Sequence, residues 1–434
     1  MRSSVQTLEA LKREITVVVP ADEVDVAYTK RLNEVAKTVK LNGFRPGKIP
    51  VNVIEQRFSQ GVLDEVASKL IQTHFDKAIT ESQIRVAGVP SVTEMSIKKG
   101  EPFEFKATFE VYPTIDLKLL TGVTVDREAA TVTDDDLSAM LEKIQKQHAT
   151  YKVVERNAKT GDRVLIDFDG SIDGEAFEGG AAKQYTLELG AKSMIPGFEE
   201  GIVGMNIGDT KDVMVTFPED YQAEDLKGKE AKFTIVLHKI EEAELAPVND
   251  ELAKKMQVEG GVDALKAKIR EGMERELKEK LAARLKETVL DKLLELNVID
   301  VPESLVLSEA KHLKKMSMER MAGQYGMKIE QVEKLNFPDD LYKPQADKRV
   351  RLGLLLAEVI MKYTIQADAD KIKARIKEIA AYYQKPAEVE QWYLSNKEAA
   401  SEIEAAVIED QAIEQLLKEA TVIDKVVGYK DIIA

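Results

Sequence analysis

Glycine and turn-forming residues are distributed unevenly along the 434-residue chain, and this distribution constrains its fold most. Residues 151–246 contain 11 of the 24 glycines, whereas the longer segment 247–434 contains 7. In 151–246, dipeptides such as Asp169-Gly170 and Gly179-Gly180 separate short strand-like runs, a pattern typical of β-structure with tight turns. The chain therefore joins different architectures, and its length predicts about two to four domains.

Residues 1–112 have the pattern of an α+β domain. Hydrophobic periodicity predicts, in order, a strand, two helices and two strands, at 13–19, 21–40, 50–80, 84–98 and 102–112. The last strand alternates apolar and polar residues, so one of its faces is expected to pack and the other to meet water. Pro113 ends this domain. Residues 113–150 are expected to form a connector, whose helix begins after the capping residue Thr133.

The C-terminal part, residues 247–434, is predicted to be mostly helical. Apolar residues recur every four positions along one charged stretch, namely at Ile269, Met273, Leu277, Leu281, Leu285, Val289 and Leu293. This spacing predicts a long amphipathic helix. The predicted fold class is therefore multidomain α+β, with an α+β part, a β-rich part and a helical part. The expected boundaries are 1–112, 113–150 for the connector, 151–246 and 247–434.

Composition excludes several kinds of chemistry. The chain has no cysteine and only four histidines, which lie far apart. Disulfides, thiolate metal sites and a Cys nucleophile are therefore excluded, and a His-based metal site is disfavoured. The formal charge of −15 argues against a general nucleic-acid binder. No apolar signal segment begins the chain, and no stretch approaches the roughly 20 apolar residues of a membrane helix. We therefore expect a cytoplasmic protein without a metal or a cofactor.

A loop near the N-terminus carries basic and aromatic residues. Its sequence is Gly43, Phe44, Arg45, Pro46, Gly47, Lys48, Ile49 and Pro50. Two glycines and two prolines in eight residues cannot continue a helix. Over residues 37–57, five basic residues face a single acid, so an exposed Phe44 beside Arg45 would suit a binding interface. Composition alone favours another interpretation, a helix connector in which Phe44 packs into the local core.

An acidic segment and a group of methionines each have a structural explanation as well as a functional one. The segment from Asp167 to Glu178 places acidic side chains at calcium-loop spacing, but Ile172 stands where such a loop requires glycine. Acidic hairpin turns explain this segment better. A group of methionines would suit either a surface that accepts many apolar partners or a flexible core; its members are Met316, Met318, Met321 and Met327.

Two segments together resemble the bacterial trigger factor family of ribosome-associated folding chaperones. Residues 43–50 match the docking signature of that family, G-F-R-x-G-x-x-P. Residues 161–246 are similar to FKBP-type prolyl isomerase domains in five motifs, namely Asp167-Phe168-Asp169-Gly170, Phe177-Glu178-Gly179-Gly180, Leu189-Gly190, Met194-Ile195-Pro196-Gly197-Phe198-Glu199-Glu200-Gly201 and Phe217-Pro218-Glu219-Asp220-Tyr221. Many FKBP-type domains have Trp and Tyr where this chain has Phe198 and Phe168, a departure that affects the expected binding of macrolide inhibitors more than the expected activity.

The resemblance implies an enzyme site in an FKBP-like domain made of an antiparallel β-sheet and a helix. This domain would lie in sequence between a ribosome-docking α+β domain and a helical chaperone domain. It would catalyse the cis–trans isomerisation of X–Pro bonds in an apolar pocket, without a cofactor. The pocket residues that the resemblance implies are Phe168, Phe177, Glu178, Tyr185, Met194, Ile195, Phe198, Tyr221 and Phe233.

The resemblance also implies partners. The ribosome-binding residues would be Gly43, Phe44, Arg45, Pro46, Gly47, Lys48 and Pro50, docking on the large ribosomal subunit beside the exit tunnel. There the chain would bind nascent and unfolded polypeptides, keep them open and assist their folding and export. A weak homodimer is expected off the ribosome, and neither DNA nor a membrane is expected as a partner. Three interpretations stay open: a prolyl isomerase with extra binding domains, a holdase with an auxiliary isomerase, and an inactive FKBP-like scaffold.

Overall fold

The computed structural model describes residues 2–39, 41, 44, 49–221, 223–335, 337–383 and 385–433. The chain divides into two compact units. One unit comprises Met1–Arg127 and Arg284–Asp424, and the other comprises Glu128–Ala283 and Lys425–Ala434. Within the described ranges, every helix is too short or too polar to cross a membrane.

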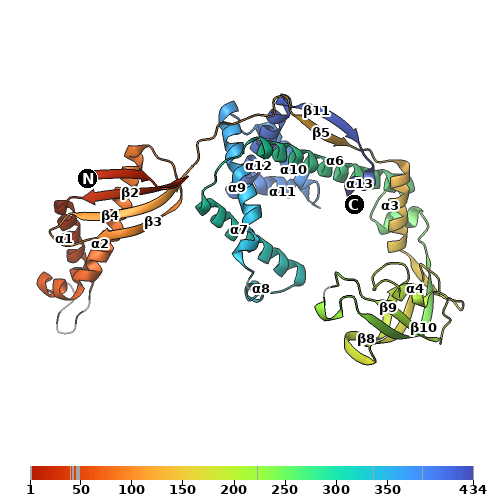
Figure 1. Cartoon of the computed structure of the whole chain (residues 1–434). Helices are drawn as coiled ribbons and strands as arrows, with labels where there is room; N and C mark the ends of the chain where they lie inside the picture. Colours follow the sequence, from red (N-terminus) through yellow and green to blue (C-terminus); the bar gives the residue numbers. More distant parts are fainter. Residues whose placement is uncertain are drawn as a thin grey trace. The chain divides into compact units, whose positions relative to one another are not determined.

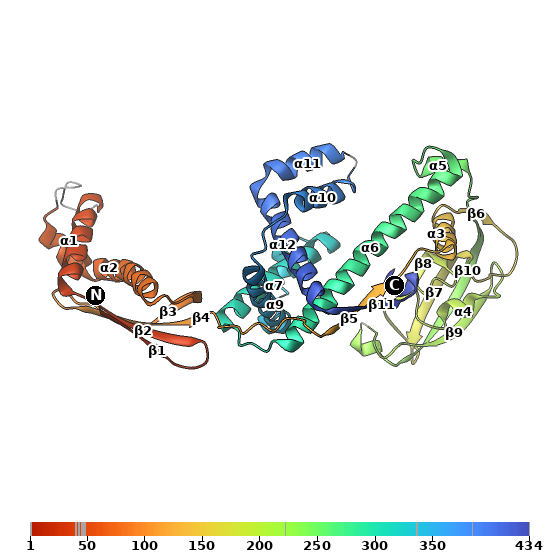
Figure 2. The same cartoon turned by 90° about the horizontal axis from the view of Figure 1, so that it is seen from above.

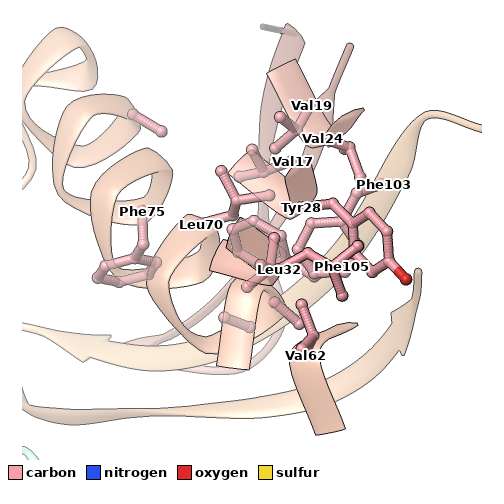
Figure 3. Packing of buried hydrophobic residues seen from close by; sticks show 14 of the residues in the cluster. Val17, Val19, Val24, Tyr28, Leu32, Val62, Leu70, Phe75, Phe103 and Phe105 are labelled. Atoms are coloured by element: carbon pink, nitrogen blue, oxygen red, sulfur yellow. The ribbon is translucent and has the colours of Figure 1, made fainter. Parts of the chain in front are cut away.

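The N-terminal residues form an antiparallel sheet with the strand order β1-β2-β4-β3. The strands are β1 (Arg2–Thr7), β2 (Lys12–Val19), β3 (Val86–Ser96) and β4 (Phe103–Val111). Helices α1 (Ala21–Thr38) and α2 (Val51–Ser82) cover one face of this sheet (Figure 1). The alternation predicted for β4 is confirmed, because Phe103, Phe105 and Phe109 are buried. Figure 3 shows Phe103 and Phe105 beside Tyr28 and Leu32 of α1.

Strand β1 has no signal in the sequence pattern. Every residue of β1 is exposed, so the alternation that marks a half-buried strand is missing. The strand is held by antiparallel pairing with β2, from Arg2 opposite Val18 to Thr7 opposite Arg13. It forms an edge of the sheet and adds no side chain to the core.

The connector contains β5 (Thr124–Ala129), α3 (Asp134–Gln147) and β6 (Thr150–Val153). The predicted cap at Thr133 is confirmed: its Oγ1 accepts a hydrogen bond from the N–H of Asp136 at 3.2 Å. The Asp136 carboxylate in turn accepts one from the N–H of Thr133 at 3.1 Å. This capping box pairs backbone donors that a helix start otherwise leaves unbonded.

The β-rich segment forms a second antiparallel sheet, with the order β6-β10-β7-β8 and with β9 paired to β10. Its further strands are β7 (Arg163–Ile172), β8 (Glu175–Glu188), β9 (Thr210–Thr216) and β10 (Glu230–Glu244). A five-residue helix, α4 (Phe198–Ile202), packs against β9, and a short 3-10 turn, η1, spans Glu224–Leu226. The core between α4 and the sheet includes Ile166, Ile202 and Ile235, each with no exposed surface.

The C-terminal part is mostly helical, as predicted. Its elements are α5 (Asp250–Lys255), α6 (Gly261–Leu296), α7 (Glu303–Tyr325), α8 (Ile329–Glu333), η2 (Asp339–Leu341), α9 (Lys343–Tyr363), α10 (Ala369–Ala380), α11 (Pro386–Ser395), α12 (Lys397–Glu419), β11 (Thr421–Val426) and α13 (Tyr429–Ile433). Helices α10, α11 and α12 lie together (Figure 2). Strand β11 pairs with β5, a long-range pairing that the sequence pattern does not predict.

The apolar stripe predicted on α6 is confirmed, and it serves two separate cores. In the first half of the helix, Met273 and Leu277 pack with Leu137 and Leu141 of α3. In the second half, Val289 and Leu293 belong to a cluster formed with residues of α9 and α12. The predicted fold class is confirmed, since an α+β region, an antiparallel sheet with a helix and a helical region follow one another. The exact domain boundaries stay a prediction.

Candidate active site

A continuous chain of aromatic rings lies between α4 and the second sheet. Its rings come from β7 (Phe168), β8 (Phe177 and Tyr185), α4 (Phe198), β10 (Phe233) and the segment after β9 (Phe217 and Tyr221). Most of these residues are far apart in sequence. The sheet therefore gathers aromatic side chains that no single stretch of the chain could bring together.

Phe198 lies at the centre of these rings. Its side chain has no exposed surface. Its ring centroid lies 5.4 Å from that of Phe168 and 5.2 Å from that of Phe233, with interplanar angles of 80° and 85°. Aromatic rings prefer such edge-to-face arrangements because the positive edge of one ring meets the negative face of the other. The contacts therefore fix the position of Phe198 as well as burying it.

The remaining predicted site residues surround this centre. Phe177, Met194, Ile195 and Tyr221 are partly buried against the same core. The ring of Tyr185, which is 40% exposed, contacts Phe168 at 5.7 Å. Glu178 is exposed on β8, next to Phe177. The result is a buried aromatic floor with partly exposed apolar side chains around it.

Phe217 is part of the ring chain but is missing from the set implied by the resemblance. Its ring bridges Phe177, at 5.9 Å, and Tyr221, at 4.7 Å. A sequence signal for it exists, because the inward-facing residues Val213 and Val215 of β9 are followed at the same period by Phe217.

Two glycines allow the rings to approach the backbone. A Cβ atom on Gly170 would lie 2.6 Å from the Phe233 ring, and one on Gly180 would lie 2.8 Å from the Phe177 ring. Real Cβ atoms do not come so close to carbon atoms. Any other residue at these two places would therefore displace an aromatic side chain of the site.

Glu199, next to Phe198, anchors the loop that carries Met194 and Ile195. Its side chain is 5% exposed. Its carboxylate accepts backbone hydrogen bonds, at 2.7 to 3.2 Å, from the N–H groups of Gly190, Lys192, Ser193 and Met194. Burial by itself raises the pKa of Glu199, but these hydrogen bonds outweigh it and hold the pKa below the ordinary value. Glu199 lies in a motif shared with FKBP-type domains, but with 77 acidic residues in the chain the sequence does not show that this carboxylate is buried and bonded to the backbone.

The acidic segment that resembles a calcium loop is a β-hairpin turn. Asp173 and Gly174 connect β7 to β8 with φ values of 53° and 89°. Positive φ at both central residues is typical of the tight turns that join antiparallel strands. Among the described residues, no group of three or more His, Asp or Glu side chains is arranged to hold a metal ion.

The N-terminal loop is described only in part. Gly43, Arg45, Pro46, Gly47 and Lys48 lie outside the described residues. Phe44 is 40% exposed, and its N–H donates to the carbonyl of Leu41 at 3.1 Å. Ile49 is buried in the N-terminal core, and Pro50 caps the start of α2. The exposure of Phe44 does not fit the alternative in which this side chain packs into the core.

Some of the clustered methionines lie in the core and others are exposed on the surface. Met318 is buried on α7, whereas Met316 and Met327 are exposed. Other large apolar side chains are exposed on α11 and in the segment between α10 and α11, namely Trp392, Leu394, Tyr382 and Tyr383. The helical region thus combines packed cores with exposed apolar side chains.

Comparison with known proteins identifies similar chains over the whole length. Family models described as bacterial trigger factor protein, and as its C-terminus, match residues 1–144 and 261–418. A model of the FKBP-type peptidyl-prolyl cis-trans isomerase matches residues 154–238. The chain is 47% identical to the trigger factor of Coxiella burnetii over 430 residues, covering 99% of this chain and 97% of the relative. It is 42% identical to that of Saccharophagus degradans over 433 residues, covering 99% and 98%.

One solved structure also aligns along the chain. It is described as "Promiscuous Substrate Recognition in Folding and Assembly Activities of the Trigger Factor Chaperone". The alignment covers 96% of this chain and 99% of that one, at 17% identity and a TM-score of 0.45.

Replacing Glu199 by Gln is expected to destabilise the β-rich region at pH 7 by about 2–4 kcal/mol, because hydrogen bonds to a buried carboxylate are lost. The folded-state pKa of Glu199 is lowered. The stabilisation is therefore complete above the unfolded pKa of about 4.3 and is lost as the pH falls through the lower folded value. Calorimetric unfolding of both proteins between pH 7 and pH 3 measures this difference, which should shrink below about pH 4.

Glu200→Gln is the matched control. Glu200 is exposed and accepts a hydrogen bond from the N–H of Gly197 at 3.0 Å, so a loss of no more than about 1 kcal/mol is expected. Equal losses for the two variants at pH 7, or a difference for Glu199→Gln that does not change with pH, would contradict the role given to Glu199.

Proposed function

The chain belongs to the bacterial trigger factor family, and we propose that it binds polypeptides emerging beside the exit tunnel of the large ribosomal subunit and isomerises their X–Pro bonds. Residues 154–238 are an FKBP-type peptidyl-prolyl cis–trans isomerase domain within a trigger factor chaperone. The observation that carries the proposal is the aromatic floor around Phe198, which lies inside this domain.

The chemistry requires an environment that favours a twisted amide. An X–Pro bond rotates over a barrier of about 18–20 kcal/mol, because amide resonance holds the bond planar. Resonance separates charge, so the twisted state carries less charge separation than the planar one. An apolar surface therefore binds the twisted state better than water does. Every 1.4 kcal/mol or so of such selective binding gives a tenfold higher rate.

We assign the isomerase site to the predicted set of residues together with Phe217. In this assignment Phe168, Phe198 and Phe233 form the floor against which the proline ring packs. The partly exposed side chains hold the residues on either side of the proline, and Glu178 lies at the edge. The residues assigned to this edge and rim are Phe177, Glu178, Tyr185, Met194, Ile195, Phe217 and Tyr221.

Membership of the family implies binding to ribosomes and to nascent chains. We propose that the docking site is the loop formed by Gly43, Phe44, Arg45, Pro46, Gly47, Lys48 and Pro50. An exposed aromatic ring beside basic side chains suits a surface made of RNA and protein, where cations meet phosphate groups. The exposure of Phe44 supports this assignment.

We further propose the domain division 1–112, 113–150, 151–246 and 247–434, with the helical part binding unfolded clients. Exposed apolar side chains on the helices, surrounded by charge, suit weak contacts with many sequences. Several such contacts on one client raise the total affinity without any new interaction. We also propose that the protein is cytoplasmic and partly ribosome-associated. Off the ribosome it forms a weak homodimer, and neither DNA nor a membrane is a partner. Assistance to both folding and export follows from holding clients open.

Phe198→Ala is expected to lower kcat/KM on a proline-limited refolding substrate at least about tenfold, because the centre of the ring chain is removed. Suppression of aggregation of a proline-free client by the same variant should stay unchanged, since that activity is assigned to the helical part. Both measurements use the full chain.

Because Phe198 is fully buried, its replacement can unfold the domain, so a second variant with a smaller effect on stability is needed. Tyr221→Ala removes a partly exposed ring and should lower the isomerase rate with little loss of stability. If both variants kept the isomerase rate of the parent while their folds stayed intact, the site would lie elsewhere.

Replacing Phe44 and Arg45 together by alanine is expected to lower co-sedimentation with large ribosomal subunits at least about tenfold, through loss of an anchor ring and of a cation. Binding of the parent should also weaken as salt rises from about 50 to 200 mM.

The matched control for this variant changes to alanine Val89 on β3 and Lys98 in the loop between β3 and β4. Both side chains are well exposed, Val89 by 89% and Lys98 by 68%, so the control removes similar groups from another surface. Unchanged ribosome binding of the Phe44/Arg45 variant, or an equal loss in the control, would overturn the docking assignment.

A further inference from the structure

A carboxylate on the central strand of the β-rich domain lies between two irregularities of the sheet. Asp167 is on β7, which pairs with β8 on one side and with β10 on the other. Both pairings shift register at or beside this residue. A β-bulge bends its strand and changes the direction of nearby side chains, and bulges are common beside active sites.

The bulge on β8 is directly opposite Asp167. Ile166 pairs with Tyr185 and Phe168 pairs with Ala182, so Lys183 and Gln184 together face the single residue Asp167. Gln184 has a φ of 53°, in the left-handed region that few residues other than glycine adopt. Its N–H donates a hydrogen bond to Oδ1 of Asp167 at 2.7 Å. The carboxylate thus pairs the backbone donor of the strained residue.

The other carboxylate oxygen of Asp167, Oδ2, contacts the bulge on β10. Leu237 pairs with Ile166 and Lys239 with Leu165, which leaves His238 as the extra residue. Nε2 of His238 lies 2.9 Å from Oδ2 of Asp167. The carboxylate therefore joins the irregular residue of β8 to the irregular residue of β10, across the strand that carries Phe168.

We propose that Asp167 is a positioning residue of the prolyl isomerase site, because its hydrogen bond to the bulge residue Gln184 sets the orientation of Tyr185 against Phe168. Tyr185 follows Gln184 directly, and its ring meets the edge of Phe168 at 5.7 Å with an interplanar angle of 85°. Phe168 in turn contacts the rings of Phe198 and Phe233. This inference rests on the proposed function, since it concerns the same site.

The hydrogen bond to the backbone, and not the contact with His238, carries this role. His238 is exposed, so water competes for its contact with the carboxylate and this contact contributes little by itself. A backbone N–H in a left-handed bulge has a fixed direction, so its acceptor fixes the conformation of the bulge. The pKa of Asp167 is lowered first by this backbone hydrogen bond and then by His238, in agreement with the geometry.

The test compares three single variants in the full chain. Asp167→Ala removes the acceptor, and kcat/KM on a proline-containing peptide should fall about fivefold. Asp167→Asn keeps a carbonyl oxygen for the Gln184 N–H, so its kcat/KM should stay within about twofold of the parent. Asp169→Ala removes an exposed carboxylate two residues further along the same face of β7, and kcat/KM should not change.

A double variant separates positioning from a general loss of stability. In a Tyr185→Ala background, Asp167→Ala should cause no further loss of kcat/KM, because the side chain that it orients is already gone. Three results would each overturn the inference. The first is an equal loss of kcat/KM from Asp167→Ala with and without Tyr185, and the second is an Asp167→Asn variant as impaired as Asp167→Ala. The third is an unchanged kcat/KM for Asp167→Ala. If Asp167→Ala fails to fold, Asp167→Asn with a normal rate and an unshifted Gln184 amide resonance still supports it. A shifted resonance with an unchanged rate contradicts it.

The outcome for Phe198→Ala keeps this inference separate from the proposed function. Loss of activity in Phe198→Ala with none in Asp167→Ala removes only the positioning role. Retention of activity in Phe198→Ala removes the site itself.

Discussion

The packing of the Phe198 ring between Phe168 and Phe233 is the interaction on which the β-rich domain depends. The short helix α4 brings the ring there and makes three further contributions from neighbouring residues. Gly197 begins the helix with a φ of 91°, which a residue with a side chain would adopt only with strain. Gly201 lets the helix lie close to β9, since a Cβ atom there would come within 2.4 Å of Val213. Glu199 holds the loop that presents Met194 and Ile195.

In the proposed site, catalysis and stability would therefore depend on the same residues. The aromatic rings of this proposed site are at once the core of a small sheet and the surface that would bind a proline ring. Removing a ring therefore costs packing as well as activity. The polar side chains Glu199 and Asp167 differ in this respect, because each acts on the backbone that carries an aromatic or apolar site residue. Variants at these two positions can alter the site while most of the core stays intact.

Much of the architecture could be predicted from local patterns. Alternation located β4, a capping signal located the start of α3, and a four-residue spacing located α6. The partners of these elements could not be predicted, because pairings such as β5 with β11 depend on contacts between distant residues. Strand β1 has no buried residue and hence no periodic signal. At the site, the ring residues follow from a family resemblance. Glu199 and Asp167 lie in the same motifs, but their hydrogen bonds to backbone N–H groups could not be predicted, because the donors come from other parts of the chain.

The net negative charge of the chain is not evenly distributed among its regions. Residues 151–246 contain 11 basic and 20 acidic side chains, whereas residues 1–112 contain 16 and 15. A net charge of −15 is thus compatible with a basic docking loop on an almost neutral domain, because screening limits the reach of distant acids to about 10 Å. The absence of cysteine is equally compatible with the proposed chemistry, since rotation about an amide needs no nucleophile.

The central claim is that the rings around Phe198 bind proline-containing segments. The most direct measurement is an NMR titration of the full chain, labelled at its methionine methyl groups, with a peptide containing an X–Pro bond and with the same peptide carrying alanine instead of proline. The account predicts saturable shifts for Met194 with the proline peptide and much smaller ones with the alanine peptide. Met205 is buried in the same core and is not assigned to the site, so its signal should hardly respond. Equal shifts with both peptides, or an unchanged Met194 signal during binding, would contradict the account.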